Sequence, residues 1–489
     1  MKVAIIGCGV TGMSTGIILQ KAGIDTVIFE KNDKPGGVIA VYKKSILINN
    51  ALEFVYGTAQ NTFANDMWQN LGVFKKSPEL KTCFNTFCWG DNSVSIYKDF
   101  DKTVNELILL SPQDKKSILK LGKSIGKFRK IEMPLITKAS GNVFGRLFRL
   151  FLNCFAVIPD VLCYGMINFK RYSKRIKGQE LKNFFSEVLN SKRSVLQYIV
   201  LWSFYSSGNF STPDNNQQEM TETLYNSYID SGGKVVFKNN LNNVVIRNKN
   251  ICALNFDDDT EHDFDYVIFS NDIASVNEIM NNSDRKFPTL EKTIKKEHIT
   301  SSCMLYFSLD CADADGIVGS LSIPCKPFKV GCRYFDKFSV RIQKNTGTGN
   351  PAVSVTLYQN EEDFSEWKKI CDAGWEQYKQ EKSRVAQCVA ASVEERFPDL
   401  RGKLHLCDIV TPLTYHRYTG VNCGGWMPES WNPLVYLRFG RGHMPGIKNA
   451  SIVGQKVFPI GGTTIGAFSG VKLAEKLIRI ADKNKKIKH

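Results

Sequence analysis

The sequence has few of the residues and spacings from which metal and disulfide sites are built. Its 14 cysteines include no C-x-x-C pair, and its six histidines show no ligand spacing. Structural zinc needs closely spaced Cys and His ligands, so we expect no metal site. The first apolar run begins at residue 3, and no signal peptide is recognisable before it. We therefore expect reduced cysteines and a cytoplasmic location.

Long uncharged apolar runs are also absent. Since no run reaches 18 apolar residues, we expect no membrane-spanning helix. Neither a Walker loop nor a serine-hydrolase arrangement is visible, and because no recognition motif occurs we expect no nucleic-acid partner. The 489 residues are 43% hydrophobic and 23% charged, which is typical of a globular protein with two domains.

The net charge of +16 is concentrated in one segment. Between Lys115 and Arg193, 18 Lys and Arg stand against four acids, so this segment alone carries +14. Its most apolar part, residues 147–169, is interrupted by polar residues. The pattern is typical of two arrangements: a helical face on an anionic membrane, or a helical subdomain with a solvated basic outer face. We expect 115–193 to form a basic helical cap, and the first arrangement would make the protein peripheral on the inner face of a membrane.

The N-terminal stretch carries a nucleotide-binding pattern. Val3–Ile6 predicts a buried strand, and Gly7, Gly9 and Gly12 follow in the spacing G-x-G-x-x-G. A helical stretch and a second strand come next, and Glu30 ends that strand. This order is the fingerprint of a dinucleotide-binding β-α-β unit. The glycines let a pyrophosphate approach the backbone at a helix N-terminus, and the carboxylate of Glu30 can accept hydrogen bonds from ribose hydroxyl groups.

Three motifs in the same order make the sequence resemble the FAD-dependent phytoene desaturase family. The first is the glycine turn with Glu30 and Pro-Gly-Gly at 35–37, the second is DIVTPLTYHRYTG at 408–420, and the third is the Gly-rich segment 447–477. The family includes carotenoid desaturases, carotenoid isomerases and retinol saturases, within the wider flavin amine oxidase superfamily. The resemblance covers nearly the whole chain and implies FAD as the cofactor.

The resemblance also implies roles for individual residues. The glycine turn would bind the FAD pyrophosphate, Glu30 the adenosine ribose, and Leu241 the adenine through its backbone. Gly454 and Gln455 would contact the pyrophosphate and the ribityl chain, and residues 462–465 would lie against the flavin ring at a helix N-terminus. The expected cofactor contacts are Gly7, Gly9, Val10, Thr11, Gly12, Glu30, Lys31, Gly36, Gly37, Val38, Leu241, Asn271, Gly454, Gln455, Gly462, Thr463, Thr464 and Ile465.

Departures from the family pattern concern the substrate side. Val38 stands where the family has Arg after two glycines, Ala51 stands where a Gly is usual, and PDNNQQ at 213–218 replaces a Pro-x-Gly-Gly. The equivalent loops line the flavin and the substrate entry in relatives. FAD binding is therefore expected with a substrate that need not be a carotenoid.

The implied chemistry is hydride transfer at flavin N5 on a hydrophobic, isoprenoid-like or lipid-like substrate, with desaturation, saturation or isomerisation of a C=C bond. Such reactions need an apolar tunnel and few catalytic side chains. The candidates for the proton step are Glu53, Tyr415, His416 and Arg417, and a structural role at a domain junction is the alternative for each. Two other classes stay open: a flavin amine oxidase, and a non-catalytic lipid-binding carrier on the same fold.

The predicted fold class is α/β, with a discontinuous Rossmann-like FAD-binding domain, an inserted α+β substrate domain and the basic helical cap. Strand-turn-helix patterns for the nucleotide site occur in three separate blocks, which we assign to the FAD-binding domain: 1–75, 206–290 and 421–489. The two insertions between them, 76–205 and 291–420, are assigned to the substrate domain. The expected partners are a hydrophobic small molecule and an anionic membrane surface.

Overall fold

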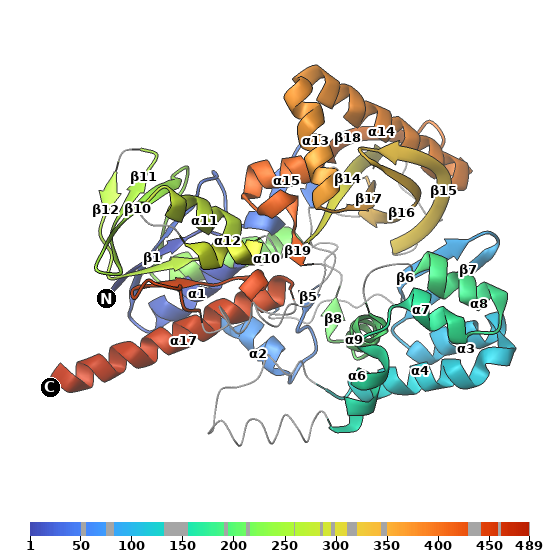
Figure 1. Ribbon diagram of the computed structural model, residues 1–489, viewed down its shortest axis with the longest axis horizontal. Helices are drawn as coiled ribbons and strands as arrows, with labels where there is room; N and C mark the ends of the chain where they lie inside the picture. Colours follow the sequence, from blue (N-terminus) through green and yellow to red (C-terminus); the bar gives the residue numbers. More distant parts are fainter. Residues whose placement is uncertain are drawn as a thin grey trace.

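The structure is a computed structural model in which two sheets and a group of helices lie side by side (Figure 1). In Figure 1 the N-terminal sheet is at the left, the second sheet at the upper right and the helical group at the lower right. The structure describes residues 1–49, 55–74, 83–131, 155–189, 194–211, 216–258, 260–283, 287–294, 299–310, 320–343, 350–428, 442–457 and 461–488.

The N-terminal sheet is parallel, and its five strands are ordered β20-β13-β1-β2-β9. Short runs of β-branched and aromatic residues form these strands, and the inner ones are almost fully buried, as expected for a parallel sheet covered on both faces. The strands are β1 (Lys2–Ile6), β2 (Asp25–Phe29), β9 (Lys234–Val236), β13 (Tyr266–Phe269) and β20 (Ala450–Ile452).

Two helices from opposite ends of the chain pack closely on each other, and the first of them lies on this sheet. α1 (Val10–Lys21) follows the glycine turn, and α17 (Thr463–Lys488) is the last helix of the chain. A Cβ added to Gly470 of α17 would lie 2.4 Å from Thr15 Oγ1 and 2.7 Å from the carbonyl oxygen of Thr11. The glycine therefore lets the two helix backbones approach more closely than any side chain would allow.

Smaller elements lie around the N-terminal sheet or, in the case of the pair β3 (Val41–Lys43) and β4 (Leu47–Asn49), share an apolar cluster with the second sheet. α10 (Asn216–Asp230) packs against α1, and the side chain of Thr62 caps α2 by accepting a hydrogen bond from the backbone N–H of Asn65. The remaining elements here are α2 (Phe63–Asn70), α11 (Ile273–Asn281), α12 (Pro288–Ile294), β10 (Leu241–Arg247), β11 (Asn250–Phe256), β12 (Glu261–His262), and the strand pair β5 (Val55–Tyr56) with β8 (Phe210–Ser211).

The second sheet is mostly antiparallel and runs in the order β18-β14-β17-β16-β15-β6-β7, with β19 (Met427–Pro428) added to β14. One face carries α13 (Glu361–Ala373) and α14 (Trp375–Arg396), whose inner residues share a core with the strands. α15 (Pro412–Thr419) follows β18. The strands are β6 (Cys83–Trp89), β7 (Asn92–Tyr97), β14 (Ile299–Leu309), β15 (Ser320–Val330), β16 (Arg333–Gln343), β17 (Ala352–Gln359) and β18 (Leu404–Val410).

The helical group has its own apolar core below β6 and β7. Its buried residues include many aromatic side chains, among them Phe184, Phe185 and Trp202. The helices are α3 (Phe100–Leu110), α4 (Lys115–Phe128), α6 (Ile158–Tyr164), α7 (Phe169–Tyr172), α8 (Gln179–Asn183) and α9 (Val195–Ser206). Within the described ranges, no helix combines the length and apolarity that crossing a bilayer requires.

Several sequence expectations need correction at the level of single elements. The pattern of residues 80–108 predicts short strands, but Phe100–Leu110 form α3, which Asp99 caps through its side chain. Residues 364–397 predict one long charged helix that ends before Pro398, but the structure has two helices, since Gly374 lies between them with a φ of 156° that favours glycine. Alternating apolar residues predict a strand around Val38–Tyr42, but β3 begins only at Val41 and residues 37–39 form a 3₁₀ turn.

The chain crosses between the two sheets several times. Strands of the parallel sheet come from each of the three blocks assigned to the FAD-binding domain, and strands of the second sheet come from both blocks assigned to the substrate domain. The fold is therefore mixed α/β, with a Rossmann-like nucleotide-binding domain and an additional sheet domain. The residue boundaries of the domains stay predictions.

The close packing of α17 on α1 makes a stability prediction. Gly470→Ala should lower the free energy of unfolding by about 1–3 kcal/mol, because the added methyl group has no room against α1. Gly126→Ala is a matched control in α4, where a Cβ would meet nothing within 4 Å. It should be neutral or slightly stabilising. Urea unfolding followed by circular dichroism measures both, and equal midpoints for the two variants would contradict the packing argument.

Candidate functional site

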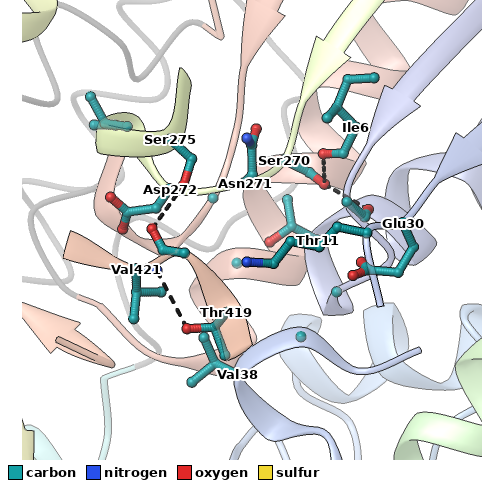
Figure 2. Close-up of a pocket in the computed structure, with 18 of the residues that line it drawn as sticks. Ile6, Thr11, Glu30, Val38, Ser270, Asn271, Asp272, Ser275, Thr419 and Val421 are labelled. Atoms are coloured by element: carbon teal, nitrogen blue, oxygen red, sulfur yellow. Dashed lines mark hydrogen bonds between the residues drawn. The ribbon is translucent and has the colours of Figure 1, made fainter. Parts of the chain in front are cut away.

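A cavity of about 440 Å³ opens where the strands of the parallel sheet end. Ile6, Phe29 and Val453 line it at or just past the carboxyl ends of β1, β2 and β20, and Ser270 and Asn271 line it just past β13. This edge is where open α/β sheets bind their ligands. Figure 2 shows Ile6 at the end of β1, Glu30 after β2, and Ser270 and Asn271 after β13 around the cavity.

The glycine turn supplies a wall without side chains. Gly9 precedes α1 in an extended conformation, and a Cβ placed on it would meet no protein atom within 4 Å. A Cβ on Gly12 would lie 2.1 Å from the carbonyl oxygen of Gly7, so Gly12 serves the packing of the turn against its own helix. Gly9 therefore leaves open space beside the N-terminus of α1, where an anion is favoured.

The carboxylate of Glu30 is fixed in place at the end of β2. One oxygen accepts a hydrogen bond from the backbone N–H of Cys8 at 2.8 Å, and the other accepts from the backbone and side chain of Asn32 at 3.0 and 2.9 Å. Glu30 is buried and lines the cavity. Since each carboxylate oxygen can accept more than one hydrogen bond, Glu30 can also receive ribose hydroxyl groups.

The Pro-Gly-Gly sequence is joined directly to the glycine turn. The N–H of Gly36 donates to the carbonyl oxygen of Cys8 at 2.9 Å, and Gly36 has a φ of 117°. A Cβ on Gly37 would lie 3.3 Å from the Cα of Gly9. The second glycine pair thus packs its backbone against the first, and both line the cavity.

The segment after β13 closes the cavity on the far side of β1. The hydroxyl of Ser270 donates towards the carbonyl oxygens of Ile6 and Gly7, both at 2.9 Å (Figure 2). Asp272 caps α11 by accepting from the N–H of Ala274. These contacts hold Asn271, which lies between Ser270 and Asp272, at the cavity wall.

A buried ion pair lies in the same wall. Asp272 Oδ2 and Lys456 Nζ are 2.7 Å apart, and their side chains are only 3% and 7% exposed. Both residues line the cavity. Two opposite charges there leave the wall close to neutral, although the chain carries a large net positive charge.

The C-terminal segment reaches the cavity through Gln455. Its side-chain oxygen accepts from the N–H of Gly462 at 2.8 Å, and its side-chain nitrogen donates to the carbonyl oxygen of Trp426 at 2.7 Å. Trp426 in turn donates through its indole N–H to Ser302 in β14. Gln455 therefore ties the N-terminus of α17 to the second sheet.

Burial shifts two titratable groups near the glycine turn. Desolvation raises the pKa of the Cys8 thiol well above its usual range, and the nearby carboxylate of Glu30 adds to the effect. The thiol stays protonated, which argues against a nucleophilic role. Burial lowers the pKa of Lys31, and the carboxylates of Glu30 and Glu278 partly oppose this shift.

The residues around the cavity fit a dinucleotide. The side-chain oxygens of Asn271 and Asn239 are buried in the wall without a hydrogen-bond partner among the described residues. Buried polar atoms of this kind normally have a partner, so they are open acceptors for a bound polar ligand. The space beside Gly9 and the engaged carboxylate of Glu30 match the pyrophosphate and ribose of such a ligand.

The structure brings together most of the expected cofactor contacts. Three of the expected residues do not line the cavity: Gly12 packs inside the glycine turn, Ile465 is buried, and the hydroxyl of Thr464 donates to the carbonyl oxygen of Tyr56 at 2.8 Å. The expected residues that line it are Gly7, Gly9, Val10, Thr11, Glu30, Lys31, Gly36, Gly37, Val38, Leu241, Asn271, Gly454, Gln455, Gly462 and Thr463.

The described catalytic candidates lie outside the lining of this cavity, unlike most of the expected cofactor contacts. Tyr415 is buried, and its hydroxyl lies 3.1 Å from the sulfur of Met304. His416 Nδ1 lies 2.9 Å from the carbonyl oxygen of Val421, and the guanidinium of Arg417 stacks on Trp375 and Tyr418. None of the three lines the cavity. Glu53 lies outside the described residues, so the catalytic assignment of all four stays a prediction.

Sequence reasoning missed several residues of the wall. Asp272 follows the expected Asn271 and could have been found as a helix N-cap ahead of an apolar run. No local sequence pattern pointed to Lys456, because its ion-pair partner, Asp272, is far away in the sequence. Ser270 and Asn239 also line the cavity without matching any motif considered.

Comparisons with known proteins agree with the fold. Residues 5–70 match the NAD(P)-binding Rossmann-like domain. Over 63 residues the chain is 41% identical to the FAD-dependent urate hydroxylase of Mycolicibacterium vanbaalenii, a match that covers 12% of this chain. The match spans only 16% of the length of that relative, so it concerns the nucleotide-binding unit alone.

Solved structures match almost the whole chain. An oxidoreductase of Methanosarcina mazei has a TM-score of 0.59 at 14% identity, covering 97% of this chain and 100% of the other. Cyclohexylamine oxidase of Brevibacterium oxydans and putrescine oxidase bound to putrescine each have a TM-score of 0.59 at 12% identity, covering 98% of this chain and 99% of theirs. At such identities the likeness shows the shared fold. The chain is thus a two-domain protein built on a Rossmann-like nucleotide-binding domain.

The buried ion pair makes a second prediction. Lys456→Met should lower the free energy of unfolding by about 3–5 kcal/mol, because it leaves the carboxylate of Asp272 buried without its cation. Adding Asp272→Asn should restore most of the stability, since Asn removes the charge and still caps α11. Chemical unfolding of the three proteins without added ligand measures this. Lys368→Met, which breaks an exposed pair with Asp372, is the control and should leave the transition unchanged. A Lys456→Met protein as stable as the control would contradict the prediction.

Proposed function

We propose that this chain is an FAD-dependent oxidoreductase that acts on a hydrophobic, isoprenoid-like or lipid-like substrate. The observation that carries the proposal is the convergence of Gly9, Glu30 and Asn271 with Gly454 and Gly462 on one cavity. The resemblance to phytoene desaturases implies a dinucleotide that is bound by residues from both ends of the sequence. The FAD-dependent relative, although matched only over the N-terminal unit, supports the same cofactor.

The wall towards the second sheet favours a hydrophobic substrate. Val38, Val421, Trp426 and Met427 line the cavity and also belong to, or pack on, an apolar cluster that continues into β14 and β18. The charged residues of the cavity come from other segments, around Glu30 and the ion pair described above. An apolar surface next to the expected flavin position suits a substrate whose reacting carbon atoms carry no charge.

Each wall residue would have a defined task in this reaction. Bound FAD would accept or return a hydride at its N5 atom, while the adjacent substrate carbon loses or gains a proton. Backbone N–H groups of the glycine turn and α1 would hold the pyrophosphate, and Glu30 would hold the ribose. Gln455 would fix the turn before α17, and Trp426 would exclude water from the substrate side. Desaturation, saturation and isomerisation of a C=C bond are all compatible with this arrangement.

A flavin amine oxidase is the second candidate function. It is favoured by the two amine oxidases among the structural neighbours, which share the fold over nearly the whole chain. A non-catalytic lipid carrier on this fold is a third reading, against which the intact glycine motifs at both ends of the chain argue. The two predictions below separate these functions.

The first test concerns the cofactor. The purified protein should release FAD on denaturation, and Gly9→Asp should fold normally but bind FAD on the order of a hundredfold more weakly. A unit charge about 5 Å from the pyrophosphate costs roughly 3 kcal/mol at an effective dielectric constant of about 20. Flavin fluorescence and circular dichroism measure binding and folding separately. Gly126→Asp on the surface of α4 is the control, and a wild-type protein that cannot be reconstituted with FAD would refute the proposal.

The second test concerns the substrate class. Under anaerobic conditions, a substrate that donates hydride bleaches the flavin absorbance near its visible maximum. We expect bleaching by isoprenoid alcohols or polyenes in detergent and none by putrescine or cyclohexylamine. Trp426→Ala should slow bleaching by the isoprenoid about tenfold or more, since it opens the substrate side to water, and should leave FAD affinity unchanged. Bleaching by the amines alone would establish the amine oxidase. A carrier would show no bleaching by either class and, after its flavin is reduced chemically, would neither reduce nor isomerise a polyene.

A further inference from the structure

The helical group turns an apolar face towards solvent. α6 and the residues on either side of it expose Phe155, Leu162 and Met166 to 63%, 77% and 91% of their surface, and Ile158 and Val161 are also exposed. No charged residue interrupts the exposed positions from 155 to 166. A short amphipathic helix normally buries such residues, so this face is adapted to contact something apolar.

The face is held in a defined position by its polar side. Asp160 is buried under α6, where its carboxylate accepts from the hydroxyl of Ser124 at 2.6 Å and pairs with Lys127 Nζ at 2.7 Å. The ring of Tyr164 packs against that of Tyr172 on the following helix. These contacts fix which side of α6 faces inward, so the apolar side faces outward as part of the fold.

A stripe of lysines adjoins this face. In α4 and the turn after it, lysines at 116, 120, 123, 127 and 130 recur at alternating spacings of four and three, which places them along one side of a helix. Lys127, the fourth lysine of the stripe, pairs with Asp160 of α6, so the stripe runs next to the apolar face. α4 itself contains no acidic residue. Further exposed basic side chains follow α6, namely Lys170, Arg171, Lys174 and Arg175.

We infer that α6 and the lysine stripe of α4 form a docking surface for a bilayer that contains anionic lipid. Apolar side chains next to lysines are the composition by which helices lie on a membrane surface, with the apolar groups among the acyl chains and the lysines at the anionic headgroups. A second copy of this chain fits the surface less well, because its lysine stripe would face the same positive charge. The inference does not depend on the cofactor or the substrate proposed above.

Vesicle sedimentation of the full-length protein tests this surface. The protein should pellet with phosphatidylcholine–phosphatidylglycerol vesicles at low ionic strength, and much less with phosphatidylcholine alone or at high salt. Leu162→Glu with Met166→Glu, and separately Lys120→Glu with Lys123→Glu, should each weaken binding about tenfold or more. Circular dichroism of each variant checks that the fold is retained.

Matched controls on other surfaces make the test specific. Tyr334→Glu with Leu406→Glu changes two exposed apolar residues of the second sheet, and Lys403→Glu with Lys448→Glu reverses two exposed charges elsewhere. Both controls should bind vesicles as the wild type does. Equal recovery in the supernatant with either lipid at low salt would overturn the inference. So would a wild-type dimer in sedimentation velocity that Leu162→Glu with Met166→Glu converts to a monomer.

Discussion

The close approach of backbone to backbone at the glycine turn is the constraint on which the cavity depends. The turn must leave room for a ligand on one side and for a packed helix on the other. A side chain at either position would fill the space that the ligand or the helix needs. Gly9 meets the first need, since a Cβ there would project into empty space, and Gly12 meets the second. Gly470 in the last helix of the chain also allows close packing, because a side chain there would collide with α1. The C-terminal helix therefore lies close to the nucleotide site because Gly470 lets its backbone approach Thr11 and Thr15 of α1.

Charge in the cavity is arranged so that each buried group has a partner. Glu30 accepts three hydrogen bonds from N–H groups, and Asp272 faces Lys456. Burying these charges without such partners would cost several kcal/mol each. The amide oxygens of Asn239 and Asn271 are the exception, because they stand in the wall without a partner in the described part of the chain. The partnered carboxylates keep the wall stable, and the two unpartnered amide oxygens can accept hydrogen bonds from a bound polar ligand.

The sequence predicted the local features well and the long-range ones in part. The glycine turn before a helix and the strand that ends at Glu30 depend on neighbours within a few positions, and the structure confirms both. Lys456 could not be paired with Asp272 in advance, because no local rule links residues so distant in sequence. The outward side of α6 was equally hidden, since the only charged residue of this short helix, Asp160, would be expected on the solvent side. The fixed position of Asp160 decides it.

The link between the two domains runs through a few polar atoms at the cavity. Gln455 is bonded at once to the N-terminus of α17 and to Trp426, and Trp426 is bonded to Ser302 in the second sheet. A group that moved Trp426 on the substrate side would therefore act on the turn where the expected flavin contacts lie. Apolar packing alone would let the two sides slide, because dispersion contacts have no preferred direction, whereas these hydrogen bonds need defined distances and angles. The bonds from Gly462 through Gln455 and Trp426 to Ser302 thus hold the start of α17 at a defined position relative to β14.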